Sequence, residues 1–224
     1  MSVYRFKKAA VLGAGVMGAQ IAAHLANAGV PVVLFDLPAD GKDKNAIVNK
    51  ALANLGKLSP PPLASKALVN NIQAGNYDEH LALLADCDVI IEAIAERLDW
   101  KKSLYAKILP FVGPKAILAS NTSGLSINAL SEVLDESLHH RFCGLHFFNP
   151  PRYMHLVELI PCAKTDVDVL TSLETFLVST LGKGVVYAKD TPNFIGNLIG
   201  VFSILSILHH TEKFKMGFDE VDAL

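Results

Sequence analysis

The chain has 224 residues, of which 51% are hydrophobic and 19% are charged, and its formal net charge is −2. These values are typical of one sizeable globular domain, or of one domain and part of a second, and they exclude a disordered chain. The slightly negative charge also argues against a general nucleic-acid-binding protein.

The first half of the chain alternates short apolar runs with amphipathic segments. Four apolar runs predict strands buried on both faces, at residues 8–13, 32–36, 89–94 and 117–120. Three amphipathic segments predict helices, at residues 16–28, 42–55 and 98–109. This order predicts an α/β fold, in which helices cover both faces of a doubly wound, mostly parallel sheet.

The second half continues with two neighbouring strands, at residues 142–147 and 156–161. The short proline-containing loop between them predicts a hairpin or another sharp turn. A helix at residues 165–181 and a last strand at residues 184–188 follow. These elements complete a predicted first domain over residues 1–189.

The final segment predicts a helix that begins at Pro192, with Asp190 or Thr191 as its cap. This helix is apolar on nearly all sides, so it needs cover on every side, and little chain follows it. Residues 190–224 therefore predict the beginning of an all-helical second domain. We expect further chain, or packing in an oligomer, to cover the helix.

Three cysteines, Cys87, Cys143 and Cys162, have no CxxC spacing. This pattern predicts neither a disulfide framework nor a metal site, and it favours small buried side chains in a reducing compartment such as the cytoplasm. The N-terminus lacks the apolar segment of a signal peptide. The apolar run at residues 194–208 is too short and too interrupted by polar residues to span a membrane.

A glycine motif joins the first predicted strand to the first predicted helix. Gly13, Gly15 and Gly18 form GxGxxG, where the first glycine permits a tight turn, the second admits a pyrophosphate and the third lets helix and strand pack closely. The amides at the helix start, including those of Val16 and Met17, then point at the phosphates. The motif predicts a dinucleotide site.

Asp36 ends the second predicted strand, 18 residues beyond Gly18. A carboxylate in this position accepts hydrogen bonds from both hydroxyls of an adenosine ribose and repels a 2′-phosphate. No arginine follows it, so the sequence favours NAD over NADP as cofactor.

The run HFFNPPRYMHLVELIPC places Glu158 inside an apolar segment typical of a buried strand. Because an unpaired buried carboxylate is costly, Glu158 either faces solvent or has a specific partner, and His146 is the nearest candidate. Oxidation of an alcohol by hydride transfer requires a base, and Glu158 could orient His146 for that role. The spacing alone leaves the alternative open, in which His146 is a core histidine and Glu158 is solvated.

Five motifs follow one another in the order GAGVMG, IEAIAE, SNTS, GLHFFNP and KDTPNFIGN. Together they resemble the L-3-hydroxyacyl-CoA dehydrogenases, over residues 8–197, and most closely the long forms fused to an enoyl-CoA hydratase-like region. The resemblance implies a Rossmann-type sheet followed by a helical domain. It also implies NAD-dependent oxidation of an L-3-hydroxyacyl-CoA to the 3-ketoacyl-CoA in fatty-acid β-oxidation.

The resemblance further implies roles for residues of the reaction site. His146 matches the family's catalytic base, and Glu158 matches its partner. Ser123, which closes SNTS, matches the serine that hydrogen-bonds the substrate oxygen near the nicotinamide. Asn197 matches an asparagine that completes the site from the start of the helical domain.

Three more residues match cofactor contacts of the family. Glu96 and Lys101 match residues that contact NAD, and Asn149 matches a residue beside the nicotinamide. The residues alone also allow a plainer interpretation, in which Ser123 caps a strand end and Glu96 and Lys101 lie at a solvated helix entry.

Two positions depart from the family pattern. Asn193 stands where many members have glycine, and Leu198 stands where many have arginine. In the family the helical domain closes over the acyl-CoA and forms a homodimer. We therefore keep two alternatives: an NAD-binding fragment or module without turnover, and a related dehydrogenase of small 3-hydroxy acids.

Overall fold

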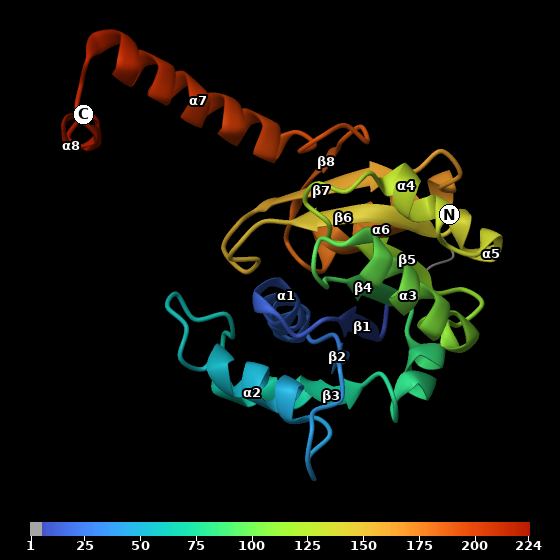
Figure 1. Cartoon of the computed structure of the whole chain (residues 1–224). Helices are drawn as coiled ribbons and strands as arrows, with labels where there is room; N and C mark the ends of the chain where they lie inside the picture. Colours follow the sequence, from blue (N-terminus) through green and yellow to red (C-terminus); the bar gives the residue numbers. More distant parts are fainter. Residues whose placement is uncertain (1–5) are drawn as a thin grey trace.

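The computed structural model describes residues 6–224, and these residues form one eight-stranded sheet with helices on both faces (Figure 1). The strands are β1 (Ala9–Leu12), β2 (Val32–Asp36), β3 (Ile72–Asn76), β4 (Val89–Glu92), β5 (Ile117–Ser120), β6 (Phe142–Phe147), β7 (Leu156–Pro161) and β8 (Gly184–Tyr187). Their order across the sheet is β3-β2-β1-β4-β5-β6-β7-β8. The predicted α/β fold with a doubly wound, mostly parallel sheet is confirmed.

Eight α-helices and three short 3₁₀ helices connect the strands within the described residues. The α-helices are α1 (Val16–Asn27), α2 (Ala46–Leu55), α3 (Leu98–Ile108), α4 (Ile127–Glu132), α5 (Glu136–His139), α6 (Val167–Ser179), α7 (Gly196–Phe214) and α8 (Phe218–Asp222). The 3₁₀ helices are η1 (Lys66–Asn71), η2 (Leu81–Asp86) and η3 (Leu109–Phe111).

The two faces of the sheet form two separate hydrophobic cores. Successive residues of β1 point to opposite faces, so Val11 packs with α1, α2 and α6, whereas Leu12 packs with α3 and α4. All four residues of β1 are completely buried. This double cover explains why the central strands are apolar without alternation.

The end of the sheet changes direction between β6 and β7. These strands are antiparallel, and β8 then pairs parallel with β7. The predicted sharp turn between two neighbouring strands is therefore confirmed, and it places His146 directly opposite Glu158 in the strand register.

Four elements, β3, α4, α5 and α2, differ from the local predictions. β3 was not predicted, because Ile72 is its only large apolar residue. A strand at the edge of the sheet, as β3 is, needs few apolar side chains. The short helices α4 and α5 were also missed. α2 begins at Ala46 rather than at residue 42, because residues 42–45 form a turn.

The helix predicted to begin at Pro192 is α7, and it begins at Gly196. Asp190 caps a different helix, because its carboxylate accepts hydrogen bonds from the backbone amides of Ile127 and Asn128, both at 2.9 Å, at the start of α4. Partial burial opposes ionisation of Asp190, but these two hydrogen bonds, together with those from the side chains of Ser126 and Asn128, outweigh it and hold the pKa of Asp190 below its ordinary value.

Asn193 explains why the helix starts late. This residue has a φ of 64°, in the left-handed region, and the next residue, Phe194, has a φ of 49°. Asparagine and glycine both tolerate this conformation, so the departure from the family's glycine leaves the turn intact. Phe194 is buried, and α7 follows directly.

α7 extends away from the sheet (Figure 1). Its large apolar side chains are exposed on all sides, from 43% for Val201 to 71% for Phe202, and Thr211 is its one buried residue. Within residues 6–224 no helix is long and apolar enough to cross a membrane. The boundary between two domains at residue 189 stays a prediction.

Candidate active site

The glycine loop lies where β1 ends and α1 begins. Gly13 has a φ of 104°, which disfavours any side chain, and a Cβ at Gly18 would collide with the carbonyl oxygen of Gly13. A Cβ at Gly15 would meet nothing within 4 Å. The loop therefore combines a tight turn, a close helix–strand contact and open space in front of the N-terminus of α1.

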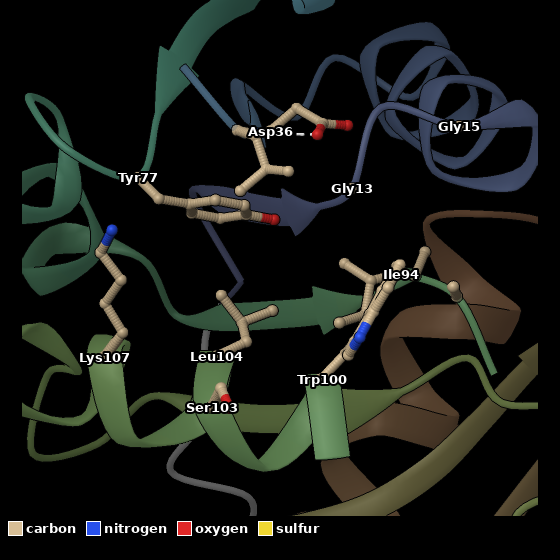
Figure 2. A pocket seen from close by; sticks show the side chains of 12 residues that line it. Gly13, Gly15, Asp36, Tyr77, Ile94, Trp100, Ser103, Leu104 and Lys107 are labelled. Carbon is tan, nitrogen blue, oxygen red and sulfur yellow. Dashed lines mark hydrogen bonds between the residues drawn. The ribbon is translucent and has the colours of Figure 1, made fainter. Parts of the chain in front are cut away.

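A cavity of about 490 Å³ adjoins this loop (Figure 2). Asp36, Tyr77, Trp100 and Leu104 contribute to its walls. Asp36 is half-buried, and its carboxylate accepts hydrogen bonds from the backbone amides of Ala14 at 2.6 Å and Leu37 at 2.7 Å. The carboxylate is therefore fixed against the glycine loop, at the edge of a space large enough for a nucleoside.

A second cavity, of about 380 Å³, lies on the other side of the same loop, between α1 and α2. Gly15 and Gln20 line it from α1, and Ile47, Lys50 and Leu58 line it from α2 and the segment that follows. Gly15 is common to both cavities, so the glycine loop separates two ligand-sized spaces.

Lys101 forms a buried ion pair, and its predicted cofactor contact stays a prediction. Lys101 is fully buried, and its ammonium lies 2.5 Å from a carboxylate oxygen of Glu92 in β4. Tyr105 and Ser120 donate to the other oxygen of Glu92, at 2.9 and 2.7 Å. The Lys101 side chain is only 1% exposed, so its charge neutralises Glu92 and has no open face toward a ligand.

Glu96 connects the end of β4 to the loop after β5. Its carboxylate accepts hydrogen bonds from the hydroxyl of Thr122 at 2.6 Å and from the backbone amide of Ser123. The side chain of Glu96 is exposed, and the hydroxyl of Ser123 makes no hydrogen bond with another described residue. Glu96 thus orients the segment from which the Ser123 hydroxyl is offered.

The strongest functional geometry lies between β6 and β7. His146 Nδ1 lies 2.7 Å from Glu158 Oε2, and both side chains are buried, at 3% and 0% exposure. The other oxygen of Glu158 accepts hydrogen bonds from the amides of Ile195 and Gly196, at 2.9 and 2.7 Å. Glu158 therefore does not face solvent, and the alternative that placed it there is wrong.

Two aromatic rings surround the histidine. The ring centroid of Phe148 is 4.5 Å from that of His146, and that of Phe194 is 5.7 Å away. With Nδ1 bonded to Glu158, Nε2 is the ring nitrogen left for a ligand, since it has no hydrogen-bond partner among residues 6–224. This arrangement provides a base, a group that orients it and an apolar surrounding.

Asn149 and Asn197 lie on the segments that flank this pair. The amide of Gln20, in the first turns of α1, donates to Asn149 Oδ1 at 3.1 Å and also to the carbonyl of Val16. Asn197 is half-buried and directly follows Gly196, whose amide binds Glu158. Their predicted contacts with the nicotinamide and the substrate stay predictions.

The structure brings most of these residues to one edge of the sheet. The parallel strands β1, β2, β4, β5 and β6 all end there, and ligands of open α/β sheets bind outside the carboxyl ends of the strands. Sequence reasoning missed Glu92, Gln20 and Tyr77. Glu92 carries the same signal as Glu158, an acidic residue in an apolar strand, whereas the contacts of Gln20 and Tyr77 arise from tertiary packing.

Comparison with known proteins identifies the family. Residues 8–191 match the model of the 3-hydroxyacyl-CoA dehydrogenase NAD-binding domain. The chain belongs to this family. A probable 3-hydroxyacyl-CoA dehydrogenase from Deinococcus radiodurans is 44% identical over 221 residues, which cover 98% of this chain and 64% of the relative. The predicted family, and NAD as the cofactor of this domain, are confirmed.

A further relative is much longer than this chain. A putative fatty acid oxidation complex trifunctional enzyme from Rickettsia felis is 44% identical over 219 residues, and the chain spans only 30% of it. The crystal structure of an (S)-3-hydroxybutyryl-CoA dehydrogenase from Ralstonia eutropha superposes with a TM-score of 0.80 at 30% identity. That match covers 96% of this chain and 75% of the other.

Proposed function

We propose that this chain supplies the cofactor-binding and proton-transfer part of an enzyme that oxidises an L-3-hydroxyacyl-CoA to the 3-ketoacyl-CoA in fatty-acid β-oxidation. The observation that carries this proposal is the buried 2.7 Å contact between His146 and Glu158, at the same sheet edge as the glycine loop. The names of the longer relatives support the substrate class and the pathway.

The cofactor site fits NAD on the features of this chain. The open space at Gly15, the amides of α1 and the fixed Asp36 carboxylate suit a pyrophosphate and an adenosine ribose. A 2′-phosphate beside Asp36 would meet a like charge, so we propose NAD rather than NADP. When bound, NAD accepts the hydride that leaves C3 of the substrate.

The proton follows a separate path. His146 Nε2 takes the proton of the 3-hydroxyl group, and the ring then carries a positive charge. Glu158 holds the Nδ1–H tautomer before the transfer and stabilises the imidazolium after it. The Ser123 hydroxyl donates a hydrogen bond to the substrate oxygen, and Asn197 completes the site. The hydride transfer and the proton transfer therefore require no reactant other than the substrate and the cofactor.

We propose that the acyl-CoA reaches this site along the second cavity. Its walls are mostly apolar, Lys50 is the one charged residue that lines it, and Gln20 connects it to Asn149. An apolar cavity with one cation in its wall suits a thioester chain that ends in phosphates. The free, buried cysteines suit a reducing compartment, and we propose the cytoplasm.

A second candidate function, NAD binding without turnover by this chain alone, is favoured by the exposed apolar surface of α7. Monomers rarely leave such a surface uncovered. We propose that further helical chain covers α7, closes over the acyl-CoA and forms a homodimer.

Replacement of His146 tests the proposed reaction. We expect His146→Gln, in the intact protein, to lower NADH production from a 3-hydroxyacyl-CoA by at least about a hundredfold, the usual scale for a lost general base. NAD affinity should stay unchanged. His139→Gln is the matched control, since His139 is also buried but contacts the carbonyl of Leu134 far from Glu158. Near-full turnover of His146→Gln would contradict the proposal.

A further inference from the structure

Tyr77 follows β3 directly, and its side chain forms part of the wall of the larger cavity (Figure 2). Only 4% of the residue is exposed. Its ring stacks on that of Phe35 in β2, with centroids 6.1 Å apart and planes 5° from parallel. Its own backbone amide binds the carbonyl of Asp36 at 3.2 Å. The stack on one face of the ring and the hydrogen bond of the backbone therefore fix the direction of the side chain.

The hydroxyl of Tyr77 is buried and makes no hydrogen bond with the described residues. Figure 2 shows it directed toward the glycine loop, between Asp36 and Ile94. An unsatisfied buried hydroxyl costs about 1–3 kcal/mol. Native proteins keep such a group seldom, and its place in a cavity wall indicates a partner that the protein itself does not supply.

The nearby polar groups of the protein are already bonded. The amide of Gly13 lies close to the hydroxyl, but it donates to the carbonyl of Phe35 at 2.8 Å, and a donor could not accept the hydroxyl proton in any case. Each carboxylate oxygen of Asp36 accepts one amide hydrogen bond, from Ala14 or from Leu37, and neither is bonded to the Tyr77 hydroxyl. The proton of the Tyr77 hydroxyl therefore lacks an acceptor among the described residues.

The charge state of Tyr77 fits a donor. Burial, and then the negative charges of Asp36 and Glu92, raise the pKa of Tyr77 well above its ordinary value. The hydroxyl consequently keeps its proton at every pH at which the protein is expected to work. It can donate to an oxygen of a ligand but cannot serve as a base.

We propose that the Tyr77 hydroxyl donates a hydrogen bond to an oxygen of the adenosine half of the dinucleotide, in the ribose or in the phosphate attached to it. The position of Tyr77 indicates the adenosine half of the dinucleotide. Asp36, Trp100 and Lys107 line the same cavity as Tyr77, whereas His146 and Asn149 do not. This inference rests on the NAD site and adds to it a donor opposite the Asp36 acceptor. Tyr77 would then hold an adenine nucleotide, and it takes no part in the proton transfer.

Tyr77→Phe isolates the hydroxyl, because phenylalanine keeps the stack on Phe35. Calorimetry with NAD, AMP, adenosine and nicotinamide mononucleotide gives the readout. We expect Kd for NAD and AMP to rise roughly five- to tenfold, the scale of one lost neutral hydrogen bond. Kd for nicotinamide mononucleotide should not change. A rise for adenosine as well assigns the acceptor to the ribose, and a rise for AMP alone assigns it to the phosphate.

The unfolding temperature without ligand provides the second readout. Removal of an unsatisfied hydroxyl should leave it unchanged or raise it, since nothing is lost in the free protein. Tyr105→Phe is the matched control: the Tyr105 hydroxyl is buried but bonded to Glu92 at 2.9 Å. That variant should unfold at a lower temperature and bind AMP normally.

Two results would overturn the inference on Tyr77 and leave the proposed NAD site unaffected. One is wild-type affinity of Tyr77→Phe for both AMP and NAD. The other is a lowered unfolding temperature without ligand, which would mean that the hydroxyl is satisfied within the free protein. Failure of the unaltered chain to bind either nucleotide would instead overturn the NAD site, and the inference with it.

Discussion

Two fully buried glutamates in one sheet, Glu92 in β4 and Glu158 in β7, have partners of different kinds. Glu92 is neutralised by the permanent charge of Lys101 and receives hydrogen bonds from Tyr105 and Ser120. All these groups belong to β4, β5 and α3, which pack inside the domain. Glu92 is therefore enclosed in a network that no ligand enters.

Glu158 is satisfied instead by groups that join different parts of the molecule. One oxygen faces His146, whose charge changes with its protonation, and the other binds the amides at the start of α7. A partner that changes its charge makes a buried carboxylate useful for chemistry, and a permanent partner makes it structural. Under the proposed mechanism, burial alone therefore does not distinguish a glutamate that serves catalysis from one that serves the fold.

The largest expected effect concerns the enclosed network. Lys101→Met should lower the free energy of unfolding by about 3–5 kcal/mol, because it leaves the Glu92 charge buried without a counter-charge. The double variant Lys101→Met with Glu92→Gln should recover most of that loss. Urea unfolding measures both. Wild-type stability of the single variant would mean that Glu92 is not charged in the folded protein.

The double variant also tests the predicted contact between Lys101 and the cofactor. In the double variant, which keeps the fold, NAD affinity should equal that of the unaltered chain if Lys101 acts only on Glu92. A tenfold loss of affinity there, measured by calorimetry, would mean that the buried ammonium reaches the cofactor after a rearrangement.

The second effect concerns the pair that changes its charge. Glu158→Gln keeps an oxygen for the α7 amides but presents an amide N–H to His146 Nδ1, which favours the opposite ring tautomer. Turnover in the intact protein should fall about a hundredfold or more, because Nε2 then carries the proton. Nitrogen NMR of the histidine ring reports the tautomer directly. A wild-type tautomer with lowered turnover would assign Glu158 a role in electrostatics alone.

The limits of sequence reasoning follow from the same two glutamates. The apolar context of Glu158 left two alternatives, a solvent-facing side chain or a specific partner, and the cross-strand register of β6 and β7 decides for the partner His146. The pattern around Glu92 was equally informative, but Lys101 lies on an amphipathic helix, where spacing does not reveal that its side chain points inward. Central strands were predictable because burial on both faces leaves a continuous apolar run, whereas the edge strand β3 has no such requirement.

Contacts between distant segments were beyond the sequence. Gln20 and Asn149 are 129 residues apart, and nothing in either motif indicates that α1 and the loop after β6 meet. The late start of α7 depends on a left-handed turn at Asn193, where the apolar pattern and the proline at 192 both favoured an earlier start. Helix caps are ambiguous for the same reason. The position of Asp190 in the sequence predicts a cap for the helix that follows it, whereas in the structure Asp190 caps α4.

The third effect extends the comparison to a buried ionisable group without an opposite charge. Burial, and then the charge of Lys183, lower the pKa of His24 in α1 to about 4. In the unfolded chain its pKa is near 6.5, so between pH 6.5 and pH 4 the unfolded state binds more protons. Stability contributed by the neutral ring is complete above pH 6.5 and is lost as the pH falls toward 4, by about 3 kcal/mol.

His24→Gln should remove this part of the pH dependence. Unfolding by urea at pH 7 and at pH 4.5 measures the difference for both chains. His80→Gln, a less buried histidine, is a suitable control and should keep the slope of the unaltered chain. An unchanged slope in His24→Gln would mean that other groups cause the acid sensitivity.

The smallest effect tests whether burial, and not distance, makes the interactions of the two glutamates strong. Lys107 and Asp78 form an ion pair at 2.7 Å, the distance that separates His146 from Glu158, but their side chains are 45% and 55% exposed. Water and salt screen such a pair, so its coupling free energy should be below about 1 kcal/mol. A double-mutant cycle of Lys107→Ala and Asp78→Ala, measured by urea unfolding, gives this coupling without the side effects of either truncation. This coupling should vanish in 1 M salt, where charges are screened within a few ångströms.

A coupling free energy as large as that expected between Lys101 and Glu92 would contradict this prediction. It would mean that a short distance alone makes an ion pair strong, and the contrast between buried and exposed carboxylates would lose its physical basis.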